Sequence, residues 1–380
     1  MPSSAFASSS ANASGATGSA SRAPSSKKKK GRIKHRDILI FTKKLSTMAA
    51  AGLPVMRTLR MLENQAENAA MKDIIGQIYK DVESGATLSE AFEKHPSAFD
   101  VVYVNLMRAG EASGRLTTFL NRLIVQIEKS EKIRAKVKKA LMYPVILLCV
   151  AFAVIMVMMI KVVPVFANMF GAMGAELPAP TQFLINASDF VRNPSQGGLA
   201  FALVAGACWA TRRVIKTNKN AKRKCDALML RLPVLSMVLR HSVLAKVAMI
   251  QGNLSSAGVS VMESLDIIRR TMKNALYDEA LARVRSGVAV GAPLSDLYAA
   301  EGELFPPAFC QMLAVGEETG NVDEMLESTA FYFEEEFDMS VDRMTELLEP
   351  IMIVAMGLTV GFIIVAMYMP IFQMGKVMGG

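Results

Sequence analysis

The chain has 380 residues, of which 52% are hydrophobic and only 20% are charged. An ordinary soluble protein has about a quarter of its residues charged, so this balance predicts a membrane protein. The formal net charge of +9 does not indicate a nucleic-acid-binding protein, because its basic part lies mostly beside apolar segments. Anionic lipid headgroups are the expected counterpart of such a pattern.

The N-terminal segment is almost wholly Ser, Ala, Gly and Pro, and it ends in Lys27 to Lys30. This composition buries too little apolar area to offset chain entropy, so we expect residues 1–37 to form a disordered basic tail. It lacks the apolar core of a signal peptide, which predicts a cytoplasmic N-terminus.

A helical period dominates residues 38–140, where Val55, Leu59 and Leu62 mark one apolar stripe. Thr87 and Glu90 have capping-box spacing, which predicts the start of a short helix. Glycines punctuate the segment into about six helices, so the pattern predicts an all-α, six-helix bundle domain on the cytoplasmic side.

The same pattern returns in the second half of the chain, at a constant offset in residue number. Val261, Leu265 and Ile268 repeat the stripe, and the Gly-Glu-x-x-Gly motif of Gly110, Glu111 and Gly114 recurs at Gly316, Glu317 and Gly320. We therefore predict a second, homologous cytoplasmic bundle over residues 243–346. Residues 41–140 carry sixteen basic and eleven acidic side chains, whereas residues 243–349 carry seven and nineteen. Such opposite charges predict that the two domains attract different partners, or each other.

Three apolar runs reach the length of about 20 residues that a helix needs to cross a bilayer. They predict transmembrane helices at 141–166, 193–213 and 347–372, the second of which is interrupted by glycines. Four prolines are expected to bracket the first and third spans without interrupting them: Pro144, Pro164, Pro350 and Pro370.

Lysines and arginines beside the spans predict the orientation of the chain. They place residues 214–242 in the cytoplasm as a basic linker, together with both bundles. Residues 167–192 are then a periplasmic loop, and residues 373–380 are a periplasmic tail.

Glu111 and Glu317 are the candidates for chemistry. One interpretation makes each a catalytic carboxylate or a metal ligand; the other makes each part of a structural turn, in which glycine supplies a positive φ and the carboxylate accepts backbone N–H bonds from the next helix. One carboxylate per domain without a histidine partner does not form an acid/base pair. We therefore predict no catalytic residue, no metal site and no cofactor.

Two further absences bear on function. The sequence contains no GxxxxGK[ST] phosphate-binding loop, so any ATP-driven work must come from a partner. The apolar cores of these spans, residues 145–163, 193–211 and 351–369, contain no Asp, Glu, His or Arg, whereas transporters usually carry ionisable or broken-helix sites near the middle of the bilayer. A transporter or channel subunit thus stays a remote alternative.

Several segments resemble one known family. They are Ala51-Gly52-Leu53-Pro54, the run from Glu83 to Phe92, the two Gly-Glu-x-x-Gly motifs, Tyr143-Pro144 and Met369-Pro370-Ile371-Phe372. Together they are similar to the type II secretion system protein F family, over roughly residues 38–375. One departure is Glu349-Pro350, where the first repeat has Tyr143-Pro144.

The resemblance implies a non-enzymatic, multi-pass platform protein of the bacterial inner membrane. It implies a homo-oligomer that contacts a hexameric cytoplasmic assembly ATPase, pilin or pseudopilin subunits and other inner-membrane assembly proteins. Assembly of a type IV pilus is the favoured role, and the equivalent place in a type II secretion system is the alternative.

Overall fold

The computed structural model describes residues 33–172 and 178–378, with the backbone alone for parts of 170–205, for 216 and 233–234, and for 370–378. Most of the predicted N-terminal tail and part of the predicted C-terminal tail therefore lie outside the described residues. Within the described ranges the secondary structure is entirely helical. The predicted all-α class is confirmed.

Two sets of six helices repeat along the chain. The first set, copy 1, comprises α1 (His35–Ala50), α2 (Val55–Gln65), α3 (Ala69–Glu83), α4 (Leu88–Glu93), α5 (Val101–Ala112) and α6 (Leu116–Val157). The second set, copy 2, comprises α11 (Pro233–Ser255), α12 (Val261–Thr271), α13 (Ala275–Ala289), α14 (Leu294–Ala299), α15 (Pro307–Thr319) and α16 (Val322–Met378), with a short 3₁₀ turn, η2 (Gly302–Leu304), before α15. Helices α12 to α16 begin at one constant offset from the starts of α2 to α6.

Side-chain caps explain several of these helix starts. Asn68 accepts a hydrogen bond from the Ala70 backbone N–H at the start of α3, and Asn274 does the same for Leu276 at the start of α13. At α4 the predicted capping box is confirmed, because Thr87 and Glu90 bond to each other's backbone N–H groups. Copy 2 has Pro293 at the matching position and no side-chain cap.

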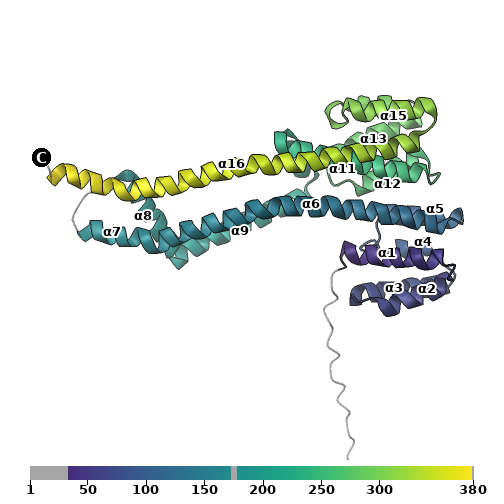
Figure 1. The fold of residues 1–380 in the computed structure, drawn as a ribbon, viewed down its shortest axis with the longest axis horizontal. Helices are drawn as coiled ribbons and strands as arrows, with labels where there is room; N and C mark the ends of the chain where they lie inside the picture. Colours follow the sequence, from purple (N-terminus) through teal and green to yellow (C-terminus); the bar gives the residue numbers. More distant parts are fainter. Residues whose placement is uncertain (1–32, 173–177, 379–380) are drawn as a thin grey trace, which may run out of the picture.

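The two copies share one core. Its buried residues run without a break from α1–α6 into α11–α16, and α5 contacts α12 while α6 contacts α16. Figure 1 shows α1–α4 on one side of α6, and α11–α15 together with α16 on the other. The two homologous helical bundles that the sequence predicts thus pack against each other, and in the described residues they form a single head.

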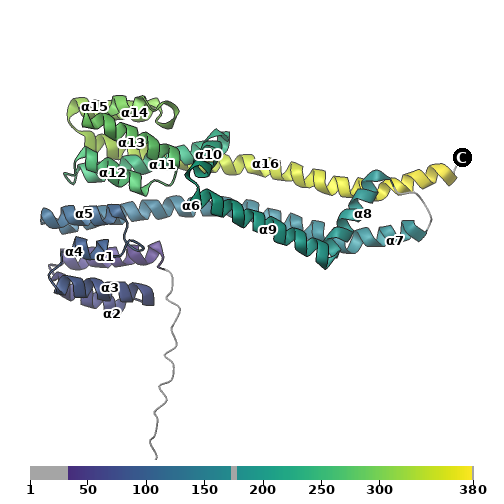
Figure 2. The ribbon, with the colours of Figure 1, turned by 180° about the vertical axis from the view of Figure 1, so that it is seen from behind.

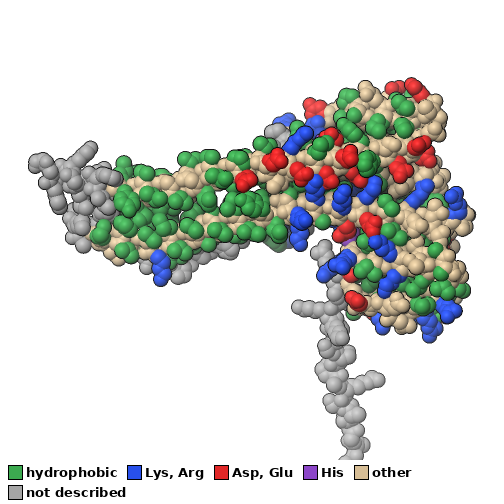
Figure 3. Space-filling view, in the orientation of Figure 1, with side chains coloured by type: hydrophobic (Ala, Val, Ile, Leu, Met, Phe, Trp, Pro, Cys, Tyr) green, Lys and Arg blue, Asp and Glu red, His purple; other side chains and the backbone are tan. Residues whose placement is uncertain are grey.

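Beyond the head, α6 and α16 extend together as a narrow arm (Figures 1 and 2). Helix α6 continues through a π-helical turn, η1 (Met158–Val162), into α7 (Val163–Ala172); the chain then forms α8 (Ala179–Arg192), α9 (Pro194–Thr217) and α10 (Lys219–Arg231). Figure 3 shows that the charged side chains gather on the head, while the arm is covered almost wholly by apolar ones.

Two helices in the described residues are long and apolar enough to cross a membrane, namely 116–169 and 322–369. They contain most of the predicted spans 141–166 and 347–372. The predicted span 193–213 is helical as α9 but is not one of these candidates, and several of its side chains lie outside the described residues. By length and composition alone, residues 219–231 and 235–255 also pass as a pair bent by 108°, yet Leu244, Val247 and Ile250 of that pair are fully buried in the head.

Two segments predicted as connections, the periplasmic loop 167–192 and the basic linker 214–242, contain helices. The predicted loop 167–192 contains α8, whose Thr181 and Ser188 hydroxyls donate to the backbone carbonyls of Ala366 and Met159. The predicted linker 214–242 contains α10 and the start of α11, and Asp226 of α10 accepts the Ala275 backbone N–H at 2.8 Å. Each segment finds backbone groups to bond in a neighbouring helix, so each packs as part of the fold.

Candidate functional site

Glu111 lies near the end of α5 and caps another helix. Its Oε1 accepts the backbone N–H of Leu88 at 2.6 Å, and its Oε2 accepts that of Ser89 at 2.9 Å. These N–H groups belong to the first turn of α4, where no intrahelical acceptor exists and the helix dipole favours a carboxylate. The sequence places these bonds on the following helix, but the structure places them on the preceding one.

Glu317 repeats this arrangement in copy 2. It accepts the N–H groups of Leu294 and Ser295 at 2.6 and 3.0 Å, and the Ser295 hydroxyl donates to it as well. Each carboxylate is thus committed to a helix start, and nothing else titratable converges on it within the described contacts. Such an arrangement joins α5 to α4 and α15 to α14.

The motif glycines serve two different needs. Gly114 and Gly320 have φ values of +66° and +74°, a left-handed conformation that glycine adopts at little cost. Gly110 and Gly316 are helical, and a Cβ at Gly316 would lie 3.0 Å from the Met325 side chain. They let α5 approach α6, and α15 approach α16, more closely than a larger residue would allow.

None of the four prolines ends a helix, and their predicted place as brackets of the membrane spans stays a prediction. Pro144 lies inside α6 and Pro350 inside α16, while Pro164 lies at the start of α7 and Pro370 in the far part of α16. A proline removes one backbone hydrogen bond, and long apolar helices tolerate that loss where neighbours satisfy the freed groups. The one irregular stretch in the first span is η1, between Pro144 and Pro164.

Where the copies meet, α6 presents lysines to acids of α16. Lys129 pairs with Glu334 at 2.9 Å, Lys132 with Asp338 at 3.5 Å, and Lys136 with both Asp338 and Asp342 at 3.2 and 3.1 Å. We call these six residues the charge seam; Figure 3 shows basic and acidic side chains facing each other there. The opposite charges of the two copies therefore attract each other within the chain.

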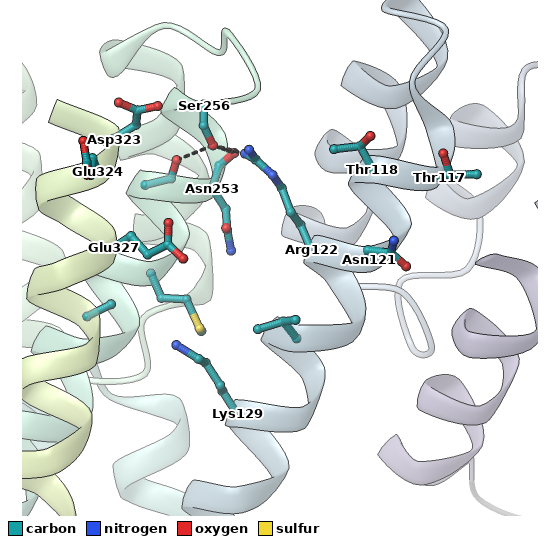
Figure 4. A pocket seen from close by; sticks show the side chains of 14 residues that line it. Thr117, Thr118, Asn121, Arg122, Lys129, Asn253, Ser256, Asp323, Glu324 and Glu327 are labelled. Atoms are coloured by element: carbon teal, nitrogen blue, oxygen red, sulfur yellow. Dashed lines mark hydrogen bonds between the residues drawn. The ribbon is translucent and has the colours of Figure 1, made fainter. Parts of the chain in front are cut away.

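A pocket of about 520 Å³ opens at the end of the charge seam that is farthest from the arm (Figure 4). Arg122 and Lys129 project from α6 on one side, and Asp323, Glu324 and Glu327 stand on α16 opposite. Arg122 donates across the pocket to the hydroxyl of Ser256, the residue that follows α11. Sequence reasoning misses this pocket, because its residues are isolated in the chain and only the pairing of the copies brings them together.

A second hollow of about 680 Å³ is lined by residues of α5, α11 and α12. Its lining mixes basic side chains such as Arg108 and Arg270 with acidic ones such as Asp266. Lys246 lines it too and donates to the Thr271 carbonyl at 3.2 Å. Burial lowers the pKa of this amine, although Asp100 opposes the shift.

Histidines and cysteines do not form a centre with the acids. Among residues 33–172 and 178–378, no group of three or more His, Cys, Asp and Glu side chains is placed to hold a metal ion. His241 contacts the Ser340 hydroxyl at 2.8 Å, and His35 and His95 line one surface pocket. The arrangement holds helices together and presents charged surfaces.

These features define the class of the protein: a helical protein with a charged, two-copy head and an apolar arm that could cross a membrane. Comparison with known proteins gives the family. The family model described as type II secretion system protein F matches residues 41–164 and 252–370, which contain all the motif glycines, glutamates and prolines discussed above. The chain belongs to this family.

Curated relatives cover nearly the whole chain. The type IV pilus assembly protein TapC of Aeromonas hydrophila is 36% identical over 351 residues, which are 92% of this chain and 84% of that protein. PilC of Pseudomonas aeruginosa is also 36% identical, over 92% of each chain. A type II secretion system protein F of Aeromonas hydrophila is 30% identical, over 90% of this chain and 87% of its own length.

Proposed function

We propose that this chain is the inner-membrane platform protein of a type IV pilus assembly machine. The relatives named for pilus assembly are 34–38% identical to it, and those named for type II secretion are 28–32% identical. It acts without catalysis of its own. Its role is to couple a hexameric cytoplasmic ATPase to the insertion and extraction of pilin subunits, as a homo-oligomer beside other inner-membrane assembly proteins.

The observation that carries this proposal is the continuity of α6 and α16. Each helix begins in the head, passes along the charge seam and runs without an interhelical loop into the apolar arm. A displacement of the head is therefore passed along two covalently continuous helices to the part of the chain that meets lipid. Glu111 and Glu317 support this coupling, because they fasten the neighbouring helices together.

Deletion of the gene in its native bacterium tests the assignment. We expect cells that still make pilin but carry no surface pili, and restoration of pili by the wild-type gene. A detergent-solubilised full-length chain should also copurify with the ATPase. Pili that persist in the deletion strain would overturn the proposal.

A second candidate function is the same platform role in a type II secretion system, which the relatives of that name favour. The same deletion strain distinguishes the two. Loss of secreted enzymes with normal pili would assign the chain to secretion, and loss of pili with normal secretion would assign it to pilus assembly.

The proposed topology places both copies in the cytoplasm, with spans at 141–166, 193–213 and 347–372, and α8 on the periplasmic side. Asn186 on α8 and Ser286 on α13 are both exposed, so a single cysteine can be placed at each in a cysteine-free chain. An impermeant thiol reagent added to intact cells should label the first and spare the second. The reverse labelling would contradict the orientation.

A further inference from the structure

Helix α10 has an unpartnered face in which basic and apolar side chains alternate. Leu228 is 62% exposed and Leu232 is 50% exposed, and Lys224 and Arg231 are exposed between and beside them. Spacings of three and four residues put Lys224, Leu228 and Arg231 on one side of α10, and Leu232 follows directly after its last residue. This face has no counterpart in the first copy, because α10 lies before the repeated helices begin.

The opposite face of α10 is anchored in the head. Asp226 accepts the backbone N–H of Ala275, Arg223 pairs with Glu279 of α13 at 3.2 Å, and Leu230 is buried. The helix therefore has a fixed rotation about its axis. Its face with Leu228 and Leu232 must point away from the protein.

The register of α11 against α16 shows where this face lies along the molecule. Gly252 packs beside Leu326, and His241 contacts Ser340 at 2.8 Å, so the two helices run antiparallel. Helices rise by the same step per residue, so Leu232, just before α11, comes level with about residue 347 of α16. The exposed apolar run of α16 begins at Ile351, one turn farther on.

The register of α6 against α16 gives the same position for Leu232 along the molecule. Lys136 pairs with Asp342, which brings about residue 141 of α6 to the height of Leu232. Leu141 is the first of the large exposed hydrophobic residues that continue along the arm. Figure 2 shows α10 at this junction, where the head narrows into the arm.

We propose that α10 is an interfacial helix that binds the headgroups of anionic phospholipids. It lies where the membrane boundary must fall if the arm spans the bilayer, so the inference rests on that part of the proposed function. Leu228 and Leu232 enter the boundary of the acyl chains, and Lys224 and Arg231 contact phosphate groups. Because α10 is fixed to α13, a bound lipid surface sets the angle between the head and the membrane.

Tryptophan fluorescence of the full-length protein in lipid nanodiscs tests this. Trp209 is the only tryptophan, so Trp209→Phe gives a silent background in which Leu228→Trp or Leu232→Trp reports on α10. Lipids brominated on the acyl chain quench a tryptophan that reaches them. Val290→Trp is the matched control, because Val290 is 84% exposed but lies at the far end of α13 from α10.

We expect quenching at Leu228→Trp and Leu232→Trp that increases when phosphatidylglycerol replaces part of the phosphatidylcholine, and none at Val290→Trp. Adding Lys224→Gln and Arg231→Gln should abolish the increase. Absence of quenching at both positions would show that this face does not reach the acyl chains, and would overturn the proposal. If the quenching changes neither with phosphatidylglycerol nor with Lys224→Gln and Arg231→Gln, α10 does not bind anionic headgroups, and that part of the proposal is overturned.

Two different readouts distinguish lipid binding by α10 from the proposed platform function: fluorescence in nanodiscs and pilus formation in cells. Wild-type pili in cells that carry Lys224→Gln and Arg231→Gln would leave the proposed function intact, whereas the fluorescence result alone decides on lipid binding. Correct insertion of each variant is verified by the labelling of Asn186→Cys in intact cells. No variant used here alters a motif glycine, a motif glutamate or the charge seam.

Discussion

Lys136 and Asp342 hold the same position in the two copies, and their side chains form an ion pair of 3.1 Å. Lys132 and Asp338 have the same relationship, at 3.5 Å. Equivalent positions of a duplicated unit thus meet at the charge seam with opposite charges. Two identical units would instead have met with like charges, which repel each other.

The charge seam should stabilise the joined head. Lys129 and Glu334 form the least exposed ion pair of the seam, with side chains 27% and 16% exposed, so Lys129→Ala should lower the free energy of unfolding by about 1 kcal/mol. Lys136→Glu should lower the free energy of unfolding further, because it places a third carboxylate beside Asp338 and Asp342. Thermal unfolding in detergent at low and high salt measures both effects.

A matched control comes from Lys43 and Glu128, an ion pair inside copy 1 whose side chains are about half exposed. Lys43→Ala should change the unfolding midpoint little, because water and salt screen such a pair. Adding Asp342→Lys to Lys136→Glu should recover part of the stability. A double variant less stable than Lys136→Glu alone would argue against pairing across the seam.

The cap formed by Glu317 should be structural. Glu317→Ala leaves the backbone N–H groups of Leu294 and Ser295 without acceptors, which costs about 1–3 kcal/mol. The adjacent Glu318 is exposed, so Glu318→Ala should have almost no effect. Glu111→Ala should behave like Glu317→Ala but more mildly, since Ser89 donates only its backbone N–H there. Equal stability of the Glu317 and Glu318 variants would refute the cap.

A buried polar pair distinguishes the core of copy 2. The Tyr298 hydroxyl donates to Gln251 Oε1 at 2.8 Å, and the Gln251 Nε2 has no partner in the described structure. Burial raises the pKa of Tyr298, so its hydroxyl keeps its proton. Tyr298→Phe leaves the buried Gln251 Oε1 without its hydrogen-bond donor as well. It should lower the free energy of unfolding by about 1–3 kcal/mol, measured by thermal unfolding.

Copy 1 supplies the compensating change, because Leu45 and Phe92 occupy the equivalent positions. Gln251→Leu together with Tyr298→Phe should regain most of the stability that Tyr298→Phe loses. If the double variant is no more stable than the single one, the lost hydrogen bond is not the cause.

His95 should make stability depend on pH. Burial lowers its pKa below the ordinary value of 6.5, Lys94 acts in the same direction, and Asp81 opposes them. The unfolded chain therefore takes up a proton near pH 6.5, while the folded chain resists it. The free energy of unfolding should fall as the pH drops below 6.5 and level off below the folded-state pKa.

His95→Gln should flatten this part of the pH profile, as followed by the unfolding midpoint in buffers from neutral to mildly acidic. The flattening should be partial, because burial also lowers the pKa of His35. An unchanged profile in the variant would assign the dependence to other groups.

Local signals explain how much of the fold was predictable. Apolar stripes, asparagine caps and positive-φ glycines fix where each helix of the head begins and ends, so the duplication was visible in the sequence. Periodicity does not say which face of a helix meets another copy. The shared core and the contact between α5 and α12 therefore needed the three-dimensional arrangement.

The prolines and α8 show a second kind of feature that local sequence signals do not predict. Proline is a strong signal for a helix end in water, but α6 and α16 pass through Pro144 and Pro350 within or beside their apolar parts. Helix α8 is short and partly polar, so nothing local separates it from a loop; its packing against α16 makes it helical. The pocket beside Arg122 was unpredictable for the same reason, since its walls come from three distant helices.

The order in which the chain is made gives the charge seam a further consequence. Helix α6 leaves the ribosome well before its equivalent, α16, so Lys129, Lys132 and Lys136 stay unpaired for most of translation. Two growing chains that meet in this state present the same basic stripe to each other and repel. Synthesis order and charge together thus favour pairing of α6 with α16 of the same molecule over pairing of α6 with α6 of another.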